Sequence, residues 1–402
     1  MERREFLRRA AAAAGAAAVG GGLHDALAAG EKVERRNERP PMKYVRLGRT
    51  NLMVSQITYG GQHANQQRIS VLAKLFDSGV NLFDTSHVYG GGRSEQAFGQ
   101  FFGQQGRRDK MFICTKVDLR RQLKKNKGVY NRAMQLADAA LRRMRTDHVD
   151  ILMLHGCASL LDWILNEEWL RAAEDLREQG KTRFIGFSEH AKPAETLTKA
   201  AKSGRYDVAM VAHSVARAAG GGGKAMTDAL AAAGKADMGI LVIKAAQRAD
   251  QMVKKANDPR VKQAGHSAHQ LCYRYVLSVP GVHSVVCGMT SHTHVEQDLA
   301  VPSIQFAARD GEHLRGLAAV SGACGFCGAC LDACPNGIAV QDILRFDAYR
   351  VSGHSEYARA EYAALDPSQR ATACRDCGSC ERACPNHVDI RRQLAQVHSR
   401  LA

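Results

Sequence analysis

Eight of the twelve cysteines lie in two runs near the carboxyl end, and each run has the spacing Cys-x2-Cys-x2-Cys-x3-Cys-Pro. Three thiolates at this spacing bind one iron-sulfur cube, and in two-cluster ferredoxins the fourth cysteine of each run binds the other cube. The sequence therefore predicts two 4Fe-4S clusters. The predicted ligands are Cys324, Cys327, Cys330 and Cys384 for the first cluster, and Cys374, Cys377, Cys380 and Cys334 for the second.

Zinc sites and disulfides are the alternatives for these cysteines. Zinc sites favour two cysteine pairs far apart in the sequence over four cysteines within eleven residues. Disulfides between cysteines this close would be strained and ambiguous in their pairing. The spacing favours clusters over both. The apolar pattern of residues 337–373, between the two runs, is helical, and this connection is much longer than in a compact bacterial ferredoxin, so it resembles the α-helical ferredoxin arrangement.

A second set of reactive side chains follows three successive apolar segments in the first half of the chain. A tyrosine, with an ordinary pKa of about 10, is a poor acid or base near neutrality until a neighbouring ammonium lowers that pKa. Here a lysine can supply the ammonium, an aspartate can hold the lysine charged, and a histidine can donate a hydrogen bond to a carbonyl oxygen. The residues are Asp84, Tyr89, Lys116 and His155.

These side chains need a scaffold that brings the ends of several strands together. From residue 44 to about residue 301, short apolar strands alternate with helical patterns, which is typical of repeated βα units around a parallel sheet. Eight strands predict an α/β protein with a closed (β/α)8 TIM barrel, whose chemistry sits at the carboxyl ends of the strands. The expected strands are 56–59, 81–83, 112–115, 149–154, 183–187, 208–212, 239–243 and 284–287.

Motifs around the four reactive residues carry a family resemblance. The run Asp-Thr-(three residues)-Tyr-Gly at 84–90 is followed about thirty residues later by Lys116 and then by Leu154-His155. With these motifs, the chain from 44 to 301 resembles the aldo/keto reductases. The resemblance implies an oxidoreductase that interconverts a carbonyl and an alcohol, with Asp84, Tyr89, Lys116 and His155 as catalytic residues and Tyr89 as the proton donor or acceptor.

The resemblance also implies a possible NADP(H) site, and this sequence departs from the family there. Relatives usually have an Asn that helps to hold the carboxamide where this chain has Glu189. They usually have a Tyr that stacks on the nicotinamide, followed by Asn, where this chain has His213-Ser214. The residues implied to contact the cofactor are Ser188, Lys244, Gly288, Thr290 and Gln297.

The amino-terminal residues 1–30 have the features of a twin-arginine export signal. Arg3-Arg4 precede Phe6-Leu7, an Ala/Gly-rich stretch covers 10–23, and Ala26-Leu27-Ala28 fits a signal peptidase site. A periplasmic location is therefore expected, by a route that carries proteins already folded with their cofactors. The alternative is a frayed amphipathic helix at the start of a cytosolic protein.

The remaining expectations concern organisation and partners. We expect a signal peptide at 1–30, a linker at 31–42, the barrel at 43–302 and a ferredoxin-like domain with two 4Fe-4S clusters at 303–402. The sequence contains no run of about 18 apolar residues, so no stable membrane span is expected. The net charge of +16 is spread along the chain without a helix-turn-helix pattern, so nucleic-acid binding is not expected. The expected partners are a small carbonyl or alcohol substrate and a redox partner protein.

One alternative function stays open. Hydride transfer moves two electrons, whereas each cluster passes one, and no flavin motif is present to split the pair. The second hypothesis is an electron-transfer or ligand-sensing iron-sulfur protein whose barrel binds a ligand without turnover.

Overall fold

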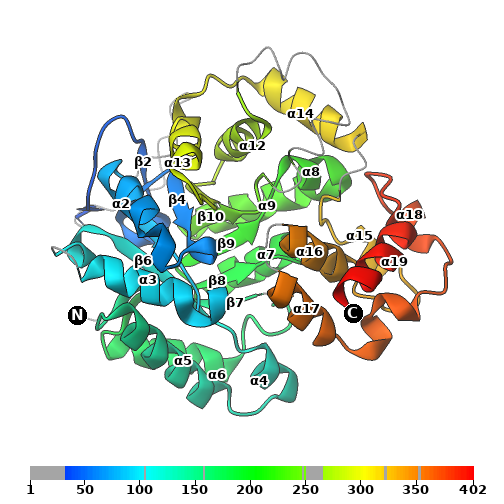
Figure 1. The fold of residues 1–402 in the computed structure, drawn as a ribbon, viewed down its shortest axis with the longest axis horizontal. Helices are drawn as coiled ribbons and strands as arrows, with labels where there is room; N and C mark the ends of the chain where they lie inside the picture. The colour runs from blue at the N-terminus through cyan, green and yellow to red at the C-terminus, as the bar shows by residue number, and fades with distance from the viewer. Residues whose placement is uncertain are drawn as a thin grey trace, which may run out of the picture. The chain divides into compact units, whose positions relative to one another are not determined.

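Eight parallel strands close into a barrel with helices around it (Figure 1). The computed structural model describes residues 32–103, 106–156, 159–246, 249, 266–320, 324–351 and 355–402, and the export signal predicted for residues 1–30 lies outside them. Around the barrel the strands follow the order β10, β11, β4, β5, β6, β7, β8, β9. Their bounds are β4 Ile57–Gly60, β5 Leu82–Asp84, β6 Phe112–Val117, β7 Val149–His155, β8 Thr182–Glu189, β9 Val208–Ala212, β10 Gly239–Ile243 and β11 Ser284–Cys287. The predicted (β/α)8 barrel is confirmed.

The strands run further into the polar residues than the sequence predicted. Lys116 pairs with Met153, and His155 pairs with Ser188, within the parallel ladders. Polar side chains do not interrupt a strand whose backbone groups stay paired, so Asp84, Lys116 and His155 belong to the ends of their strands, whereas Tyr89 lies in the turn after β5.

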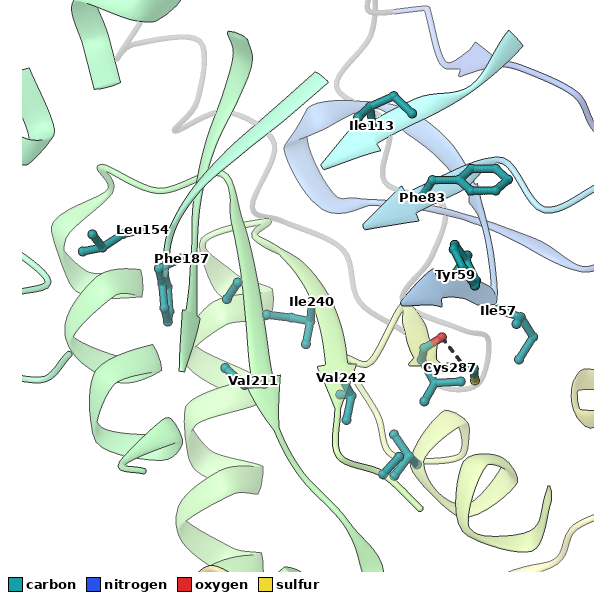
Figure 2. Close-up of a cluster of buried hydrophobic side chains, with 14 of the residues drawn as sticks. Ile57, Tyr59, Phe83, Ile113, Leu154, Phe187, Val211, Ile240, Val242 and Cys287 are labelled. Carbon is teal, nitrogen blue, oxygen red and sulfur yellow. Dashed lines mark hydrogen bonds between the residues drawn. The ribbon is translucent and has the colours of Figure 1, made fainter. Parts of the chain in front are cut away.

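Side chains alternate between two cores along each strand, as the two-residue period of a strand requires. Leu82, Cys114 and Met153 belong to the core inside the barrel. Figure 2 shows side chains of the second core, such as Phe83 and Val242, which the strands share with the surrounding helices. Those helices are α2 Ile69–Asp77, α3 Arg93–Phe102, α4 Arg120–Lys125, α5 Val129–Met144, α6 Glu167–Glu178, α7 Pro193–Ser203, α8 Val215–Arg217, α9 Gly223–Lys235, α12 Ala268–Leu277, α13 His292–Leu299 and α14 Ala308–Val320.

A small sheet precedes the barrel and contributes to its inner core. It has the order β1 (Glu34–Arg35), β3 (Leu52–Ser55), β2 (Tyr44–Arg46). The segment 31–42 was expected to be a linker, but it contains β1. The charges that suggested a linker are instead used in ion pairs, because Arg36 lies 3.4 Å from the buried carboxylate of Asp150 and Glu34 pairs with Arg183.

The carboxyl-terminal helices form their own core and pack on the barrel. They are α15 Ala329–Asp332, α16 Val340–Val351, α17 Ser355–Ala363, α18 Ser379–Arg382 and α19 Ile390–Leu401. Their shared core includes Ile343, Tyr362 and Leu394. This helical arrangement agrees with the predicted α-helical ferredoxin-like domain. None of the helices in the described part of the chain is long and apolar enough to span a bilayer.

The contacts of these helices lie on the carboxyl-end face of the barrel. Gln341 of α16 donates hydrogen bonds to the carbonyl oxygens of His190 and Ala191, both at 3.3 Å, just after β8. Arg120, which follows β6, donates to the carboxylate of Glu361 in α17 at 2.6 and 3.0 Å. Residues Val33–Ala402 accordingly form one compact unit. The face of the barrel on which α/β barrels place their chemistry is the face on which the carboxyl-terminal helices dock.

Candidate active site and cluster sites

Lys116 lies at the centre of the four predicted catalytic residues. Its ammonium donates to both carboxylate oxygens of Asp84, at 2.5 and 2.6 Å, and to the carbonyl oxygen of Thr85 at 2.9 Å. It also lies 3.2 Å from the hydroxyl of Tyr89. Burial by itself would lower the pKa of Lys116, but the carboxylate of Asp84 and the hydroxyl of Tyr89 raise it above its ordinary value. The lysine is therefore a fixed cation beside the phenol.

The turn after β5 places Tyr89 over this cation. Tyr89 begins a 3-10 turn, Tyr89–Gly92, in which Gly90, Gly91 and Gly92 all have positive φ values that suit glycine. The ammonium of Lys116 also lies 4.8 Å from the centre of the Tyr89 ring. The phenol is thus held by its hydroxyl and by its ring face.

His155 completes the group from the end of β7. Its ring lies edge-to-face with Tyr89, with centroids 5.9 Å apart, and its Nδ1 lies 3.1 Å from the hydroxyl of Ser86. Burial, with a further contribution from Lys116, holds the pKa of His155 well below its ordinary value, so the imidazole is neutral near pH 7. When Ser86 donates to Nδ1, the ring hydrogen is on Nε2, where it can be donated to a ligand. The sequence analysis did not identify Ser86.

A cavity of about 550 Å³ opens beside these residues. Asp84, Tyr89 and Lys116 line one part of it. Its other walls include polar and aromatic side chains that are not among the predicted site residues. They are far apart along the chain and belong to no motif. These residues are Gln62, His63, His190, His269, Tyr273, Asp347 and Tyr349.

Helix α16 of the carboxyl-terminal region forms a wall of this cavity. Tyr349 lines the cavity, and the ammonium of Lys244, at the end of β10, lies 4.6 Å from the centre of its ring. Lys244 has a φ of 63°, a conformation that non-glycine residues rarely adopt and that often marks functional sites. The barrel cavity and the ferredoxin-like region are therefore parts of one site.

The five residues implied to contact NADP(H) do not all face the cavity. Ser188, Lys244 and Gly288 line it, and the buried hydroxyl of Ser188 has no hydrogen-bond partner among the described residues. That hydroxyl is free for a ligand. Thr290 instead pairs with His294 at 3.1 Å, and Gln297 lies exposed on α13.

At the two places where the sequence departs from the family, the side chains make contacts with other groups of the protein. The buried carboxylate of Glu189 accepts backbone N–H groups from Leu160 at 2.7 Å, Ala191 at 2.6 Å and Lys192 at 3.3 Å, and the hydroxyl of Thr196 at 3.1 Å. It stabilises the start of α7 and does not act as an amide would toward a carboxamide.

The second departure, His213-Ser214, faces the ferredoxin-like region. Both residues border a very small cavity that Phe326 and Arg345 also line. The Ser214 hydroxyl accepts the N–H of Arg217 at 3.2 Å and so caps α8. The residues present do not supply the contacts that the resemblance implies for a nicotinamide, because Glu189 is used in hydrogen bonds within the protein and His213-Ser214 border the carboxyl-terminal region.

The eight cysteines surround two separate cavities. Each cavity takes three cysteines from one run and the fourth from the other run, in the two groups assigned from the spacing: Cys324, Cys327, Cys330 and Cys384 at one site, and Cys334, Cys374, Cys377 and Cys380 at the other. We call these the cluster-1 site and the cluster-2 site. Among the described residues, no three His, Cys, Asp or Glu side chains are placed to share a single metal ion.

The chemistry of the donor sets fits iron-sulfur clusters. Burial raises the pKa of Cys330, and the neighbouring Cys324 and Cys327 raise it further, so thiolates gathered here need a compensating metal charge. The environments of the two sites differ. At the cluster-2 site Cys377 is exposed, Cys380 is buried and the other two cysteines are partly buried, whereas all four cysteines of the cluster-1 site are partly buried. The cluster-2 site therefore reaches the surface at Cys377.

Comparison with known proteins separates the barrel from the cysteine-rich region. Residues 53–217 match the aldo/keto reductase family, and residues 323–388 match the 4Fe-4S dicluster domain. The chain is thus similar to aldo/keto reductases in its barrel and to 4Fe-4S dicluster domains near its carboxyl end.

Individual relatives cover the barrel alone. An aldo-keto reductase of Alternaria alternata is 30% identical over 182 residues, 36% of this chain and 49% of the relative. L-galactose dehydrogenase of Arabidopsis thaliana is 33% identical over 152 residues, 35% of this chain and 47% of the relative. The chain spans about half the length of these curated relatives. The structure of an aldo-keto reductase from Klebsiella pneumoniae in complex with NADPH shares the fold, with 23% identity, a TM-score of 0.54, and coverage of 69% of this chain and 95% of that chain.

The cluster assignment predicts the iron content. We expect about eight iron atoms and eight acid-labile sulfides per chain in protein purified without oxygen, because each cube carries four of each. Cys384→Ser should remove a ligand of cluster 1 and lower iron toward about half, while Cys272→Ala, a buried cysteine of α12, should leave it unchanged. Iron and sulfide assays measure both, and stoichiometric zinc in the wild-type protein would show that the assignment is wrong.

The nucleotide pocket generates a second prediction. Anaerobic titration with NADPH or NADH should give no saturable quenching of protein fluorescence, because the contacts of Glu189 and the packing at His213-Ser214 oppose the family's mode of binding. Free tryptophan at matched absorbance corrects for the inner-filter effect. Saturation at one nucleotide per chain would contradict this expectation.

Proposed function

We propose that the protein is an oxidoreductase that interconverts a small carbonyl compound and the corresponding alcohol in the barrel cavity, with Tyr89 as the proton-transfer residue. The observation that carries this proposal is the contact of the buried Lys116 with both Asp84 and the hydroxyl of Tyr89. Packing alone does not require a buried lysine to point at a phenol that lines a cavity.

The arrangement provides one donor for a carbonyl oxygen at the cavity wall and a second donor behind it. The hydroxyl of Tyr89 lines the cavity and can donate to that oxygen, where negative charge builds up as the carbonyl carbon is reduced. His155 is buried behind Tyr89 and is not among the lining residues, so its Nε2 would be the second donor only for a substrate that reaches past the phenol.

The whole reduction takes two electrons and two protons. The hydrogen on carbon would come with a hydride donor, or as a proton from water after two single-electron transfers. Tyr89 passes one proton to the oxygen, and the ammonium of Lys116 stabilises the phenolate that is left. Asp84 keeps the ammonium in place during this change. In the direction of alcohol oxidation, the phenolate accepts the proton.

The cavity suits a small substrate with both polar and apolar parts. Its volume of about 550 Å³ lies within the usual range for small-molecule sites. Met210 and Ile243 supply apolar wall, and the free hydroxyl of Ser188 can bond a polar group of the substrate.

The two 4Fe-4S clusters are the redox groups that the ferredoxin-like region would hold, through the eight cysteines of the cluster-1 and cluster-2 sites. When bound, they transfer one electron each. A redox partner protein would exchange electrons with the chain at the exposed cluster-2 site.

A ligand-binding role without turnover is the second candidate. Its support is the loss of the family's nicotinamide contacts at Glu189 and His213. In that case the barrel would sense a ligand, and the clusters would report or transfer electrons independently of it.

Substitution of Tyr89 tests the proposed chemistry. Tyr89→Phe removes only a hydroxyl, so the fold and the iron content should be kept, while turnover should fall by about 10² to 10⁴, the usual value of general acid-base catalysis. Turnover is measured with a panel of small aldehydes, ketones and conjugated carbonyls, with reduced methyl viologen or NADPH as donor. Lys116→Met should cost a similar factor and move the pH profile upward, because the phenolate loses its cation.

The matched control is Tyr130→Phe, which removes a hydroxyl bonded to Asp175 on α6 outside the cavity. It should leave turnover unchanged. Wild-type turnover in Tyr89→Phe would eliminate the proton-transfer role and favour the ligand-binding candidate.

We also propose that the protein is exported to the periplasm, on the strength of the Arg3-Arg4 pair and the Ala26-Leu27-Ala28 site. Replacing Arg3-Arg4 by Lys-Lys should hold the protein in the cytoplasm, because the twin-arginine route depends on that pair. Cell fractionation and immunoblotting measure the distribution, with Arg8→Lys as the control. Periplasmic accumulation at the wild-type level would show that Arg3-Arg4 do not direct export.

A further inference from the structure

The cluster-1 site lies directly against the barrel. A Cβ atom at Gly325, between two cysteines of this site, would lie 2.5 Å from the carbonyl oxygen of Ala216 and 3.0 Å from the backbone nitrogen of Arg217. Only glycine permits such a close approach. On the other side of the site, Asn386 donates to the same carbonyl oxygen of Ala216 at 3.3 Å. Both cysteine runs are therefore anchored on α8.

Arg217 is the buried cation at this contact. Its side chain is almost completely enclosed, with 5% of the residue exposed, and its guanidinium donates to the carbonyl oxygen of His190 at 2.9 Å. Among the described residues, no carboxylate lies within ion-pair distance of it. Burial lowers the pKa of Arg217 to about 10, opposed first by Cys327 and Cys324, so the guanidinium is charged at neutral pH.

Two other arginines near the sites, Arg345 and Arg391, have acidic partners. Arg345, also buried, pairs with Asp342 at 2.5 Å, which offsets its charge. At the exposed cluster-2 site, Arg391 pairs with Glu381 at 2.9 Å and with Asp376 at 3.2 Å.

Arg375 lines the cluster-2 site and Arg382 donates to the carbonyl oxygen of Cys377 at 3.1 Å, but both are exposed, so solvent screens their charges. Arg217 thus differs from these cations in being buried without an ion-paired carboxylate among the described residues. The carboxylates of Glu189 and Glu195 act on it only from beyond ion-pair distance.

Reduction adds one negative charge to a cube, and burial opposes that charge while a nearby cation favours it. We infer that the buried guanidinium of Arg217 raises the reduction potential of cluster 1, so that electrons arriving at the exposed cluster 2 pass on to cluster 1 beside the barrel. In this step reduced cluster 2 returns from the 1+ to the 2+ state as cluster 1 goes from 2+ to 1+, and no proton or other electron is involved.

Helix α16 joins cluster 1 to the barrel cavity. Gln341 lines the cluster-1 site and Tyr349 lines the cavity, eight residues further along the same helix. At 1.5 Å of rise per residue these positions are about 12 Å apart along the helix axis, a span that electrons cross between protein redox groups. Cluster 1 is thereby the electron-exchange group that serves the ligand in the cavity. The inference rests on the clusters of the proposed function and is independent of Tyr89.

The test is an anaerobic redox titration of the full-length holoprotein, followed by the visible absorbance of the clusters and by electron paramagnetic resonance. In Arg217→Gln one cluster should become harder to reduce, with its oxidised-to-reduced ratio at a fixed potential rising at least about tenfold, which corresponds to about 59 mV for a one-electron couple. Arg217→Lys keeps the charge and should restore most of the shift. Arg391→Gln, at the cluster-2 site, should change the ratio by less than about twofold.

A second comparison shows which cluster responds. Cys384→Ser removes a cluster-1 ligand, so adding Arg217→Gln to that variant should leave the titration of the remaining cluster unchanged. A shift of the remaining cluster in the double variant overturns the inference. The inference is also overturned if Arg217→Gln keeps its full iron content and its clusters titrate at the same potentials as those of the wild-type protein.

Equal shifts in the Lys and Gln variants would assign Arg217 a purely structural role and overturn the inference as well. If Arg217→Gln and Arg217→Met both lose the iron of cluster 1 while Arg217→Lys keeps it, the charge serves cluster binding instead of the potential. None of these outcomes depends on carbonyl turnover, so failure of the proposed reaction is distinguishable from failure of this inference.

Discussion

The ion pair between Lys116 and Asp84 is the interaction on which the site depends. Both residues are almost fully buried, and burying two charges is costly unless their geometry is good and their remaining hydrogen bonds are made. Adjacent parallel strands, β5 and β6, hold the two groups, and the three N–H donors of the ammonium are shared among the Asp84 carboxylate, the carbonyl oxygen of Thr85 and the hydroxyl of Tyr89. Because the barrel fixes this pair, the phenol always faces a cation.

Helix α16 imposes the second constraint, since one helix must fit both the cluster-1 site and the barrel cavity. Its Gln341 bridges the carbonyl oxygens after β8 to that of Phe326 at 3.0 Å, and its Tyr349 packs against Lys244. The departures at Glu189 and His213-Ser214 are explained by this fit. Glu189 stabilises the loops beneath the helix, and His213-Ser214, just after β9, border the small cavity beside Phe326 of the first cysteine run.

Much of this architecture could be predicted from the sequence, because its signals are local. Strand periodicity located the eight strands, and polar residues at the strand ends located Lys116 and Asp84. The missing parts depend on tertiary contacts. Nothing in the pattern around Tyr349 or Arg217 indicates that one lines the barrel cavity and the other lies against the cluster-1 site. Glu189 could be recognised only as a departure from the family's Asn, because the four groups that bond to its carboxylate are brought together by the fold.

In the proposed function, the sources of protons and electrons lie on different walls of the cavity. Tyr89 and Lys116 come from the early strands, whereas α16 and the cluster-1 site lie over β8 to β10. A hydride donor would deliver two electrons and a proton together from one position, but two clusters deliver electrons singly. A ligand that accepts them must hold a charged intermediate until a proton arrives, and this requires a donor set in advance. Tyr89, with the cationic Lys116 beneath it, is such a donor. The proposed reaction therefore needs both the Lys116–Asp84 ion pair, which readies the proton, and the clusters, which supply the electrons.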